Sequence, residues 1–284
     1  MIAEAERWKA KREQLLRDGV CNIEHVLDPE MLERVRTYAQ TIIAQLSEEH
    51  RREQRSTGSM VPSREMAELA ELFAWPRTFQ VFDRLGFNDV KFARAYLISK
   101  PPHSPRLFWH QDCTMWQGEP RAYSKITPQL FAMFYLTDTS PENGCLRVIP
   151  GSHRKRHRLH DLVSVAHTPE SRRVDDQDSP LYAEVEDEMD VPAKAGDLVL
   201  GDGRTLHASH PNRSDKERTV ITIWYHPMFS DQQEATQRQI SDLAQAEVVH
   251  WPESARRIVT PIIADYLGPA DPLPRDRVPG PELK

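Results

Sequence analysis

The amino-acid sequence predicts a mainly β domain with flanking helices, built as an antiparallel sandwich or barrel. From Lys91 onward, short runs rich in aromatic and branched residues follow one another, bounded by Pro, Gly or Asn. Helical segments do not separate these runs, which favours antiparallel pairing over a parallel sheet. Helical periodicity is found before and after the runs instead. We therefore expect an α+β chain with its sheets at the centre.

The length of 284 residues is ordinary for one β-rich domain, and we expect a single domain over 1–284. Its first part, 1–88, is predicted to be mostly helical. The part 89–228 forms the β core, and 229–284 returns to helix and ends in a Pro-rich tail. Within the core, 152–190 is charged and has no period, so we expect a lid-like excursion over a pocket mouth.

The elements of the first part can be placed in order. Residues 2–18 have a weak apolar face and predict a helix, and 20–26 predict a short strand. Asp28 can cap a strong helix with Pro29 in its first turn. Apolar residues then recur at helical spacing, at Met31, Leu32, Val35, Tyr38, Ile42 and Leu46. Residues 47–63 are polar and without period, so they predict a loop.

Two further helices and the strands of the core follow this loop. The helices are expected over 64–73 and 76–85. The strands are expected over 92–99, 129–137, 146–149, 198–200 and 219–225.

Composition narrows the class of protein. The net charge of −6 argues against a nucleic-acid partner. The three cysteines form neither a CxxC pair nor a disulfide framework, which fits a reducing compartment. No apolar run has the length of a membrane span, and the first residues resemble no signal or transit peptide. We expect a cytoplasmic protein that acts on a small molecule without a membrane partner, and the sequence carries no signal for an oligomeric state.

A His-x-Asp pair and a distant histidine carry the strongest chemical signal. In an extended segment, His110 and Asp112 point to the same side and can bind one ion. His207 would complete a set of two histidines and one carboxylate, which is typical of iron(II) sites with positions left open for a cosubstrate and oxygen. Arg218 follows beyond a predicted turn and can supply the guanidinium that a dicarboxylate needs. The pattern predicts an enzyme that binds Fe(II) and uses 2-oxoglutarate and O2 as cosubstrates.

Spacing alone leaves other interpretations open. Composition by itself gives about two acids two positions after a histidine, and the chain has one, at His110. A structural histidine is therefore a serious alternative on spacing alone. His210 and His226 compete with His207, and Arg213 competes with Arg218.

Several motifs in a fixed order add to this pattern. They are Ala95-Tyr96-Leu97-Ile98-Ser99-Lys100-Pro101-Pro102, His110-Gln111-Asp112, Glu142-Asn143-Gly144-Cys145-Leu146, Pro150-Gly151-Ser152-His153, Gly196-Asp197 and His207…Asn212…Arg218. This string, over about residues 90 to 227, closely resembles the phytanoyl-CoA dioxygenase family of iron(II)- and 2-oxoglutarate-dependent oxygenases. The resemblance implies a double-stranded β-helix, a jelly-roll or cupin-like barrel, with helices packed outside.

The resemblance also implies roles for individual residues. It implies iron ligation by His110, Asp112 and His207. Relatives that halogenate replace the carboxylate with a small residue, so Asp112 implies a hydroxylase. By position, Arg218 and Ser209 match the family residues that hold the far carboxylate of 2-oxoglutarate. Tyr96 and Met133 are also expected to line the cosubstrate site. Some relatives carry Trp at the position of Met133.

Substrate contacts are the least specified. Trp116 lies near the predicted metal ligands and is a candidate pocket wall, although aromatic residues in a barrel are more often core. Arg204 precedes His207 by three residues and is a second candidate. The basic run 153–158 predicts a solvated face, with an anion grip as the alternative.

We predict an enzyme, a 2-oxoglutarate-dependent dioxygenase that hydroxylates an unactivated C–H bond of a small polar metabolite and releases succinate and CO2. An acyl group on coenzyme A or another carrier is the alternative substrate. From other classes, the chain could be a non-catalytic protein that binds metal and 2-oxoglutarate, or a zinc hydrolase on the same barrel. Oxygen uptake with iron and 2-oxoglutarate separates these alternatives.

Overall fold

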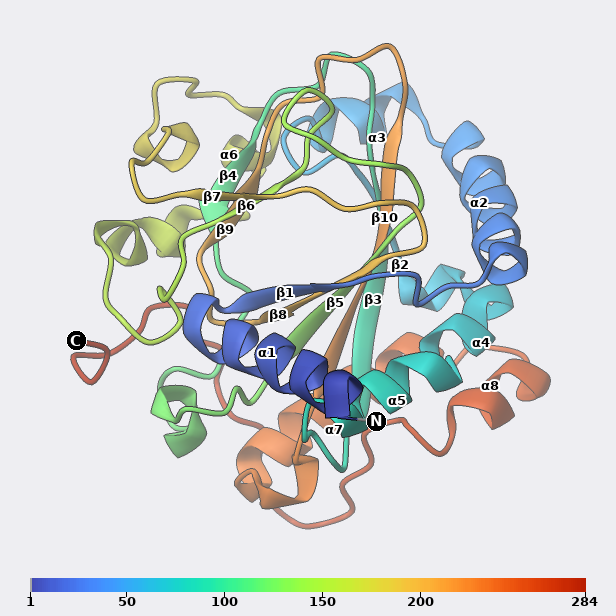
Figure 1. The fold of residues 1–284 in the computed structure, drawn as a ribbon, viewed down its shortest axis with the longest axis vertical. Coiled ribbons are helices and arrows are strands. Elements are labelled where there is room, and N and C mark those ends of the chain that lie inside the picture. The colour runs from blue at the N-terminus through green and yellow to red at the C-terminus, as the bar shows by residue number, and fades with distance from the viewer. Residues whose placement is uncertain (1) are drawn as a thin grey trace.

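The strands lie in two antiparallel sheets that pack against each other (Figure 1). The structure is a computed structural model that describes residues 2–284. The larger sheet has the order β1 (Val20–Ile23), β8 (Leu198–Asp202), β5 (Leu130–Tyr135), β10 (Arg218–His226), β3 (Lys91–Lys100) and β2 (Ser59–Pro62). The smaller has the order β4 (Leu107–His110), β9 (His207–Ser209), β6 (Leu146–Val148) and β7 (Met189–Val191).

Strands β3 to β10 follow the path of a double-stranded β-helix. The chain passes from β3 in the larger sheet to β4 in the smaller, back to β5, and then to β6 and β7. It returns through β8, β9 and β10, which alternate between the sheets in the same way. Eight antiparallel strands in this order make a jelly roll. The predicted fold class is confirmed.

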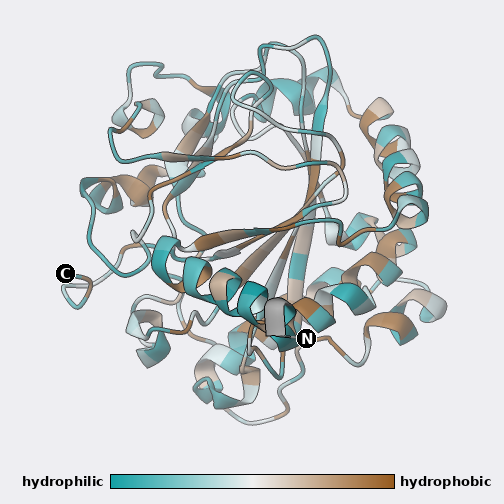
Figure 2. Ribbon diagram, in the orientation of Figure 1, coloured by the Kyte–Doolittle hydropathy of each residue, from teal (hydrophilic) through white to brown (hydrophobic). Residues whose placement is uncertain are grey.

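Alternation along the strands separates two apolar layers. On β10, Ile221 and Ile223 belong to the cluster shared with the helices, whereas Val220 and Trp224 face the space between the sheets. Figure 2 shows hydrophobic residues gathered on the strands, while the exposed helix α1 (Ile2–Asp18) is mostly hydrophilic. One face of the larger sheet is therefore available to line an internal cavity.

Helices cover the outer face of the larger sheet (Figure 1). They include α1, α2 (Pro29–Ala44), α4 (Ala70–Phe73), α5 (Pro76–Arg84) and α8 (Glu253–Val259), with α7 (Glu234–Val248) against β3. Helix α2 begins as predicted, because the Asp28 carboxylate accepts a hydrogen bond of 2.9 Å from the Met31 N–H. None of the helices in residues 2–284 is long and apolar enough to cross a membrane.

The prediction of a loop over 47–63 is wrong. Ser47 caps the short helix α3 (Glu48–Glu53) by accepting from the His50 N–H. Residues 59–62 form β2, which adds to the edge of the larger sheet by pairing with β3. Polar composition hid both elements, because one depends on a local cap and the other on a partner strand far along the chain. The helix expected over 64–73 is also broken into two 3-10 turns and α4.

The excursion 152–190 and the C-terminal tail both lie against the barrel. The excursion holds 3-10 turns over 158–165 and 180–182 and the short helix α6 (Pro169–Arg173). In the tail, the Asp276 N–H donates to the Thr114 carbonyl at 2.9 Å. The largest buried cluster draws on all three predicted parts of the chain, through Leu15, Leu97 and Trp251 among others. This shared core supports the proposal of a single domain.

Histidine 226, at the end of β10, makes stability depend on pH. Burial lowers the pKa of His226 to about 3, although the hydrogen bond between its Nδ1 and the Pro128 carbonyl opposes the shift. A histidine with a lowered pKa in the folded state contributes stability above its unfolded pKa of about 6.5, and loses it as pH falls toward the folded value. In this window His226 binds a proton in the unfolded chain but not in the folded chain.

The unfolding free energy of the wild type should fall as pH decreases from about 6 to about 4, between the unfolded and folded pKa values of His226. We expect His226→Gln to make this fall less steep by about 1.4 kcal/mol per pH unit. Urea denaturation at a series of pH values measures this slope. The control His250→Gln, at an exposed position, should leave the slope unchanged. Equal slopes in the wild type and His226→Gln would contradict the assignment.

Candidate metal and cosubstrate site

Three side chains far apart in sequence meet at one end of the smaller sheet. His110 ends β4 and His207 begins β9, and the two residues are direct partners in the antiparallel ladder. Asp112 follows β4 by two residues. Its carboxylate oxygens lie 3.8 Å from His110 Nε2 and 3.7 Å from His207 Nε2. The structure thus brings together His110, Asp112 and His207, each only 6% exposed.

The two imidazoles are held so that Nε2 is free. His110 Nδ1 lies 3.0 Å from the Phe108 carbonyl, and His207 Nδ1 lies 2.9 Å from the Thr205 carbonyl. A carbonyl accepts only, so Nδ1 carries the proton in both rings and Nε2 keeps its lone pair. Metal-bound histidines are oriented in this way by a partner on the other ring nitrogen. Both Nε2 atoms face the Asp112 carboxylate.

Asp112 is fixed by its own neighbours. Its N–H and that of Cys113 donate to the Gly203 carbonyl, each at 2.8 Å. Its Oδ2 accepts from Trp224 Nε1 at 2.8 Å. These contacts leave Oδ1 free of the indole and turned toward His110.

Protonation states in this group suit a cation. Burial lowers the pKa of His110 to about 3, and the neighbouring His207 lowers it further. Burial alone would raise the pKa of Asp112, but the two imidazoles and the Trp224 hydrogen bond outweigh it, so this pKa is lowered. At neutral pH the group offers a neutral imidazole at His110 and an ionised carboxylate, which are the forms that bind metal.

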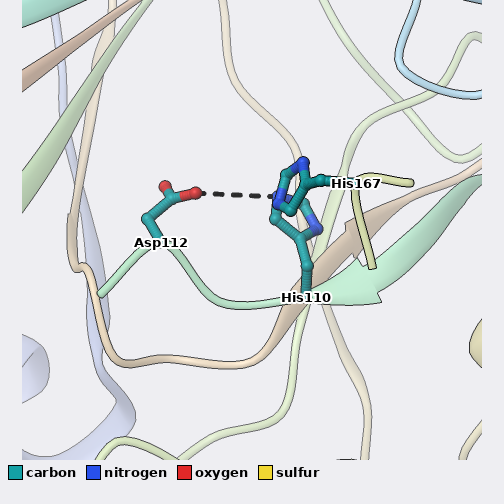
Figure 3. Close-up of side chains that lie close together, drawn as sticks. All are labelled: His110, Asp112 and His167. Carbon is teal, nitrogen blue, oxygen red and sulfur yellow. Dashed lines mark ion pairs between the residues drawn. The ribbon is translucent and has the colours of Figure 1, made fainter. Parts of the chain in front are cut away.

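A third histidine reaches the same place from the excursion 152–190. In Figure 3 the ring of His167 lies beside that of His110, with Asp112 across from them. The rings of His110 and His167 are 4.7 Å apart and perpendicular. One ligand atom from each of His110, Asp112 and His167 lies within 4.8 Å of the others. His167 Nε2 is buried and has no hydrogen-bond partner in the protein.

These side chains open into an internal cavity of about 150 Å³ between the sheets. Arg218, at the start of β10, lines the same cavity and is 4% exposed. Burial lowers the pKa of Arg218. Several buried polar atoms of this lining have no partner in the protein, among them Arg218 Nε, Ser209 Oγ and Thr222 Oγ1. Unpartnered buried donors are costly, so this end of the cavity is built for a polar ligand.

The remaining predicted cosubstrate residues lie across three adjacent strands. Tyr96 on β3 and Met133 on β5 are both register partners of Thr222 on β10. All three line the cavity. Thr222 was not predicted from the sequence, although it lies four residues after Arg218 on the same face of its strand.

The two predicted substrate residues lie elsewhere. Trp116 packs in a separate apolar cluster, where its ring centroid is 5.3 Å from that of Tyr123. Arg204 is fully buried and its guanidinium pairs with Asp202 at 2.6 Å and donates to the carbonyls of Ala122 and Ser124. Neither lines the cavity. The guanidinium of Arg204 is paired within the fold, and the Trp116 ring packs among apolar side chains, although its buried indole N–H has no partner in the protein.

The competing histidines also lie outside the cavity. His210 Nε2 is 2.6 Å from Asp190 Oδ1, and His226 is bonded to the Pro128 carbonyl. Arg213, the rival of Arg218, is exposed. The basic run 153–158 does not line the cavity either.

Three arginines and one histidine are among the cavity-lining residues that the sequence did not single out, and they are Arg94, Arg172, Arg277 and His167. His167 and Arg172 belong to the predicted lid-like excursion, which was the one available signal for them. Arg277 belongs to the Pro-rich tail. Its place depends on tertiary contacts, including the hydrogen bond from its guanidinium to the Gln111 carbonyl at 3.1 Å.

Comparison with known proteins gives a family. The model of the phytanoyl-CoA dioxygenase (PhyH) family matches residues 15–220. A protein of Stutzerimonas stutzeri named "Probable alpha-ketoglutarate-dependent hypophosphite dioxygenase" is 30% identical over 141 residues, which are 49% of this chain and 46% of that protein. An ectoine dioxygenase of Nocardia farcinica is 25% identical over 229 residues, 74% of each chain. The chain spans about half the length of several curated relatives that it matches.

A solved structure shares the fold. The crystal structure of the epimerase SnoN in complex with Fe3+, alpha ketoglutarate and nogalamycin RO has a TM-score of 0.57 and 19% sequence identity. The likeness covers 99% of this chain and 98% of SnoN. At this identity the comparison shows the architecture alone.

The hydrogen bond from Trp224 to Asp112 generates a prediction. We expect Trp224→Phe to weaken binding of a divalent metal by about tenfold to a hundredfold, because partners behind a ligand orient it and tune its basicity. Titration with Fe(II) under nitrogen, or with Ni(II), measures the change.

The matched control is Trp251→Phe, which removes a buried indole hydrogen bond to the Ser63 carbonyl far from the site. It should lose stability without losing metal affinity. If the two variants bind metal as tightly as each other, the Trp224 contact has no role in the metal site.

Proposed function

The chain belongs to the phytanoyl-CoA dioxygenase family, and from that premise we propose that it is an iron(II)- and 2-oxoglutarate-dependent dioxygenase that hydroxylates a small polar metabolite. The observation that carries the proposal is the convergence of His110, Asp112 and His207 on one point beside an unpartnered buried arginine. Two imidazoles and one carboxylate are the donor set of iron(II) oxygenases with open coordination positions.

The donor set fits the metal. His110 and His207 would bind through Nε2, because Nδ1 of each is committed to a carbonyl. Asp112 would supply the charged oxygen. We assign the second imidazole to His207 rather than His167, because the β4–β9 ladder fixes its place opposite His110. His167 stands on the excursion with a positive φ of 65°.

The polar end of the cavity fits 2-oxoglutarate. Arg218 would hold the far carboxylate of this cosubstrate, with Ser209 as a hydroxyl partner, and Thr222 further along β10 would face the cosubstrate chain. Tyr96 and Met133 would line its chain. An ionised ligand at this place would satisfy the buried donors that the protein leaves without partners.

When bound, iron(II) with 2-oxoglutarate and O2 supplies the oxidation, in which the cosubstrate becomes succinate and CO2 and one oxygen atom enters a C–H bond of the substrate. The protein's part is placement. Its walls exclude water, His110 and His207 present a fixed face, and Arg218 sets the orientation of the cosubstrate. The cavity lining holds Arg94, Arg172 and Arg277 besides the proposed cosubstrate residues, which favours a polar metabolite over an apolar acyl chain at this place.

Substitution of the carboxylate tests the proposal. We expect Asp112→Ala to abolish iron-dependent formation of succinate from 2-oxoglutarate, because the ion loses its only charged ligand. Succinate by mass spectrometry and oxygen uptake are the measurements. The control Asp190→Ala removes the carboxylate from another His–Asp pair, with His210, outside the cavity and should keep its turnover. Unaltered turnover in Asp112→Ala rejects the ligand assignment.

Arginine 218 gives a separate test. We expect Arg218→Met to raise the KM for 2-oxoglutarate by about tenfold or more, because the far carboxylate would lose a charge-assisted, forked partner. The control Arg213→Met changes an exposed arginine in the turn before β10 and should leave this KM unchanged. A KM for 2-oxoglutarate that is equal in Arg218→Met and the wild type would remove Arg218 from the cosubstrate site.

A further inference from the structure

Three arginines other than Arg218 line the cavity, and they come from separate parts of the chain. Arg94 lies on β3, Arg172 on α6 of the excursion, and Arg277 on the C-terminal tail. Among residues 2–284, Asp112 is the one acidic residue that lines this cavity. On the proposed function the charge of Asp112 belongs to the metal. The cavity therefore has an excess of positive charge inside a protein whose net charge is −6.

These guanidiniums are not used by the fold. Within residues 2–284 the ion pairs of the structure involve other arginines, such as Arg106, Arg173 and Arg204. Arg94 Nε and Arg172 Nε are buried without a hydrogen-bond partner. Arg277 donates to one carbonyl, that of Gln111, so most of its five N–H groups remain available.

The three charges converge on one region. Burial lowers the pKa of His167 well below its usual value, and the nearby arginines Arg277, Arg172 and Arg94 lower it further. Burial also lowers the pKa of Arg277. Arg94 and Arg275 lower this pKa further, and the Asp112 carboxylate opposes the shift. Arg277 bonds to the Gln111 carbonyl between His110 and Asp112, and Arg94 lies over Trp224, which bonds to Asp112. Arg172 follows His167 by five residues in the excursion. The three guanidiniums therefore line the part of the cavity next to the proposed metal ligands, and their like charges repel one another in the absence of an anion.

This region differs from the end that holds Arg218. Arg94 is the register partner of Trp224, which lies six residues beyond Arg218 on β10. At about 3.3 Å per residue, this separation is about 20 Å along the strand. The Arg94 guanidinium lies over the Trp224 ring, 5.0 Å from its centroid, and Trp224 bonds to Asp112. Arg94 is therefore on the side of the metal-binding carboxylate, remote from the predicted far carboxylate of 2-oxoglutarate.

We propose that Arg94, Arg172 and Arg277 form the recognition site for an anionic group of the substrate, a carboxylate or a phosphonate or phosphate oxyanion. The inference rests on the proposed function for the identity of the ligand as substrate. Guanidinium forks match the paired oxygens of these groups, and an anion would relieve the mutual repulsion. Because the three arginines belong to the barrel, the excursion and the tail, one anion would draw both segments onto the cavity beside His167.

Calorimetry with small probes tests the proposal. The full-length protein with Ni(II) and saturating 2-oxoglutarate is titrated with methylphosphonate, acetate and the neutral acetamide. We expect at least one anion to bind and acetamide not to bind. Tighter binding of methylphosphonate than of acetate assigns a phosphonate or phosphate group, and the reverse order assigns a carboxylate. Absence of binding by both anions, or equal binding by acetamide and acetate, overturns the proposal.

Variants locate the probe. We expect Arg277→Gln and Arg172→Gln each to weaken binding of the anion by about tenfold or more, while the Kd for 2-oxoglutarate stays within about twofold. Arg218→Met should do the opposite. The control Arg238→Gln, on the exposed face of α7, should change neither affinity. Thermal unfolding of each variant establishes that it is folded, and Arg277→Lys keeps the charge if the glutamine variant does not fold. Unchanged anion binding in both cavity variants, or parallel loss of anion and 2-oxoglutarate in Arg277→Gln, contradicts the proposal.

Separate titrations with metal, with 2-oxoglutarate and with each anion distinguish failure of this inference from failure of the proposed function. If the protein binds methylphosphonate or acetate through Arg172 and Arg277 but neither metal nor 2-oxoglutarate, the anion site stands and the oxygenase proposal fails. If metal and 2-oxoglutarate bind but no anion does, the oxygenase proposal stands and this inference fails.

Discussion

The pairing of β4 with β9 is the contact on which the site depends. It sets His110 directly opposite His207, two residues that are almost a hundred positions apart in the chain. Each ring is then fixed by a carbonyl two residues before it, from Phe108 and Thr205. A shift of one residue in this register would turn one imidazole to the other face of the sheet. The jelly-roll path places this ladder across the cavity from β10, which brings Arg218 and Trp224 to the same space.

Electrostatic imbalance is the second organising feature. The fully buried arginines outside the cavity are ion-paired, as Arg204 is with Asp202 and Arg147 is with Glu188. The cavity wall is different, because it holds four arginines and one acidic residue. Buried charges without partners are costly to a fold, and they are kept where a ligand completes them. The imbalance divides into two places: Arg218 with its hydroxyl neighbours, and the cluster around His167.

Tryptophan 224 connects the metal-binding group to the arginine cluster. Its indole N–H holds Asp112 Oδ2, and its ring lies beneath the guanidinium of Arg94 and against Tyr96. A ligand bound by Arg94 would therefore contact the surroundings of Trp224, which orients the carboxylate of Asp112. The excursion adds His167 and Arg172 from the other side. On the proposed roles, binding of substrate and ordering of the metal site would share these contacts.

The sequence by itself determined the jelly-roll class, the start of α2 and the approximate position of β10. It also determined that His110, Asp112, His207 and Arg218 share one space. Local periodicity and motif order carry that information. It misplaced the 47–63 segment, since an edge strand is defined by its partner. Only the tertiary structure decided that Trp116 and Arg204 lie outside the cavity lining and that Arg94, Arg172 and Arg277 belong to it. An arginine in a charged excursion or a Pro-rich tail has no local pattern that distinguishes a solvated side chain from a cavity wall. That distinction is made by packing between distant segments.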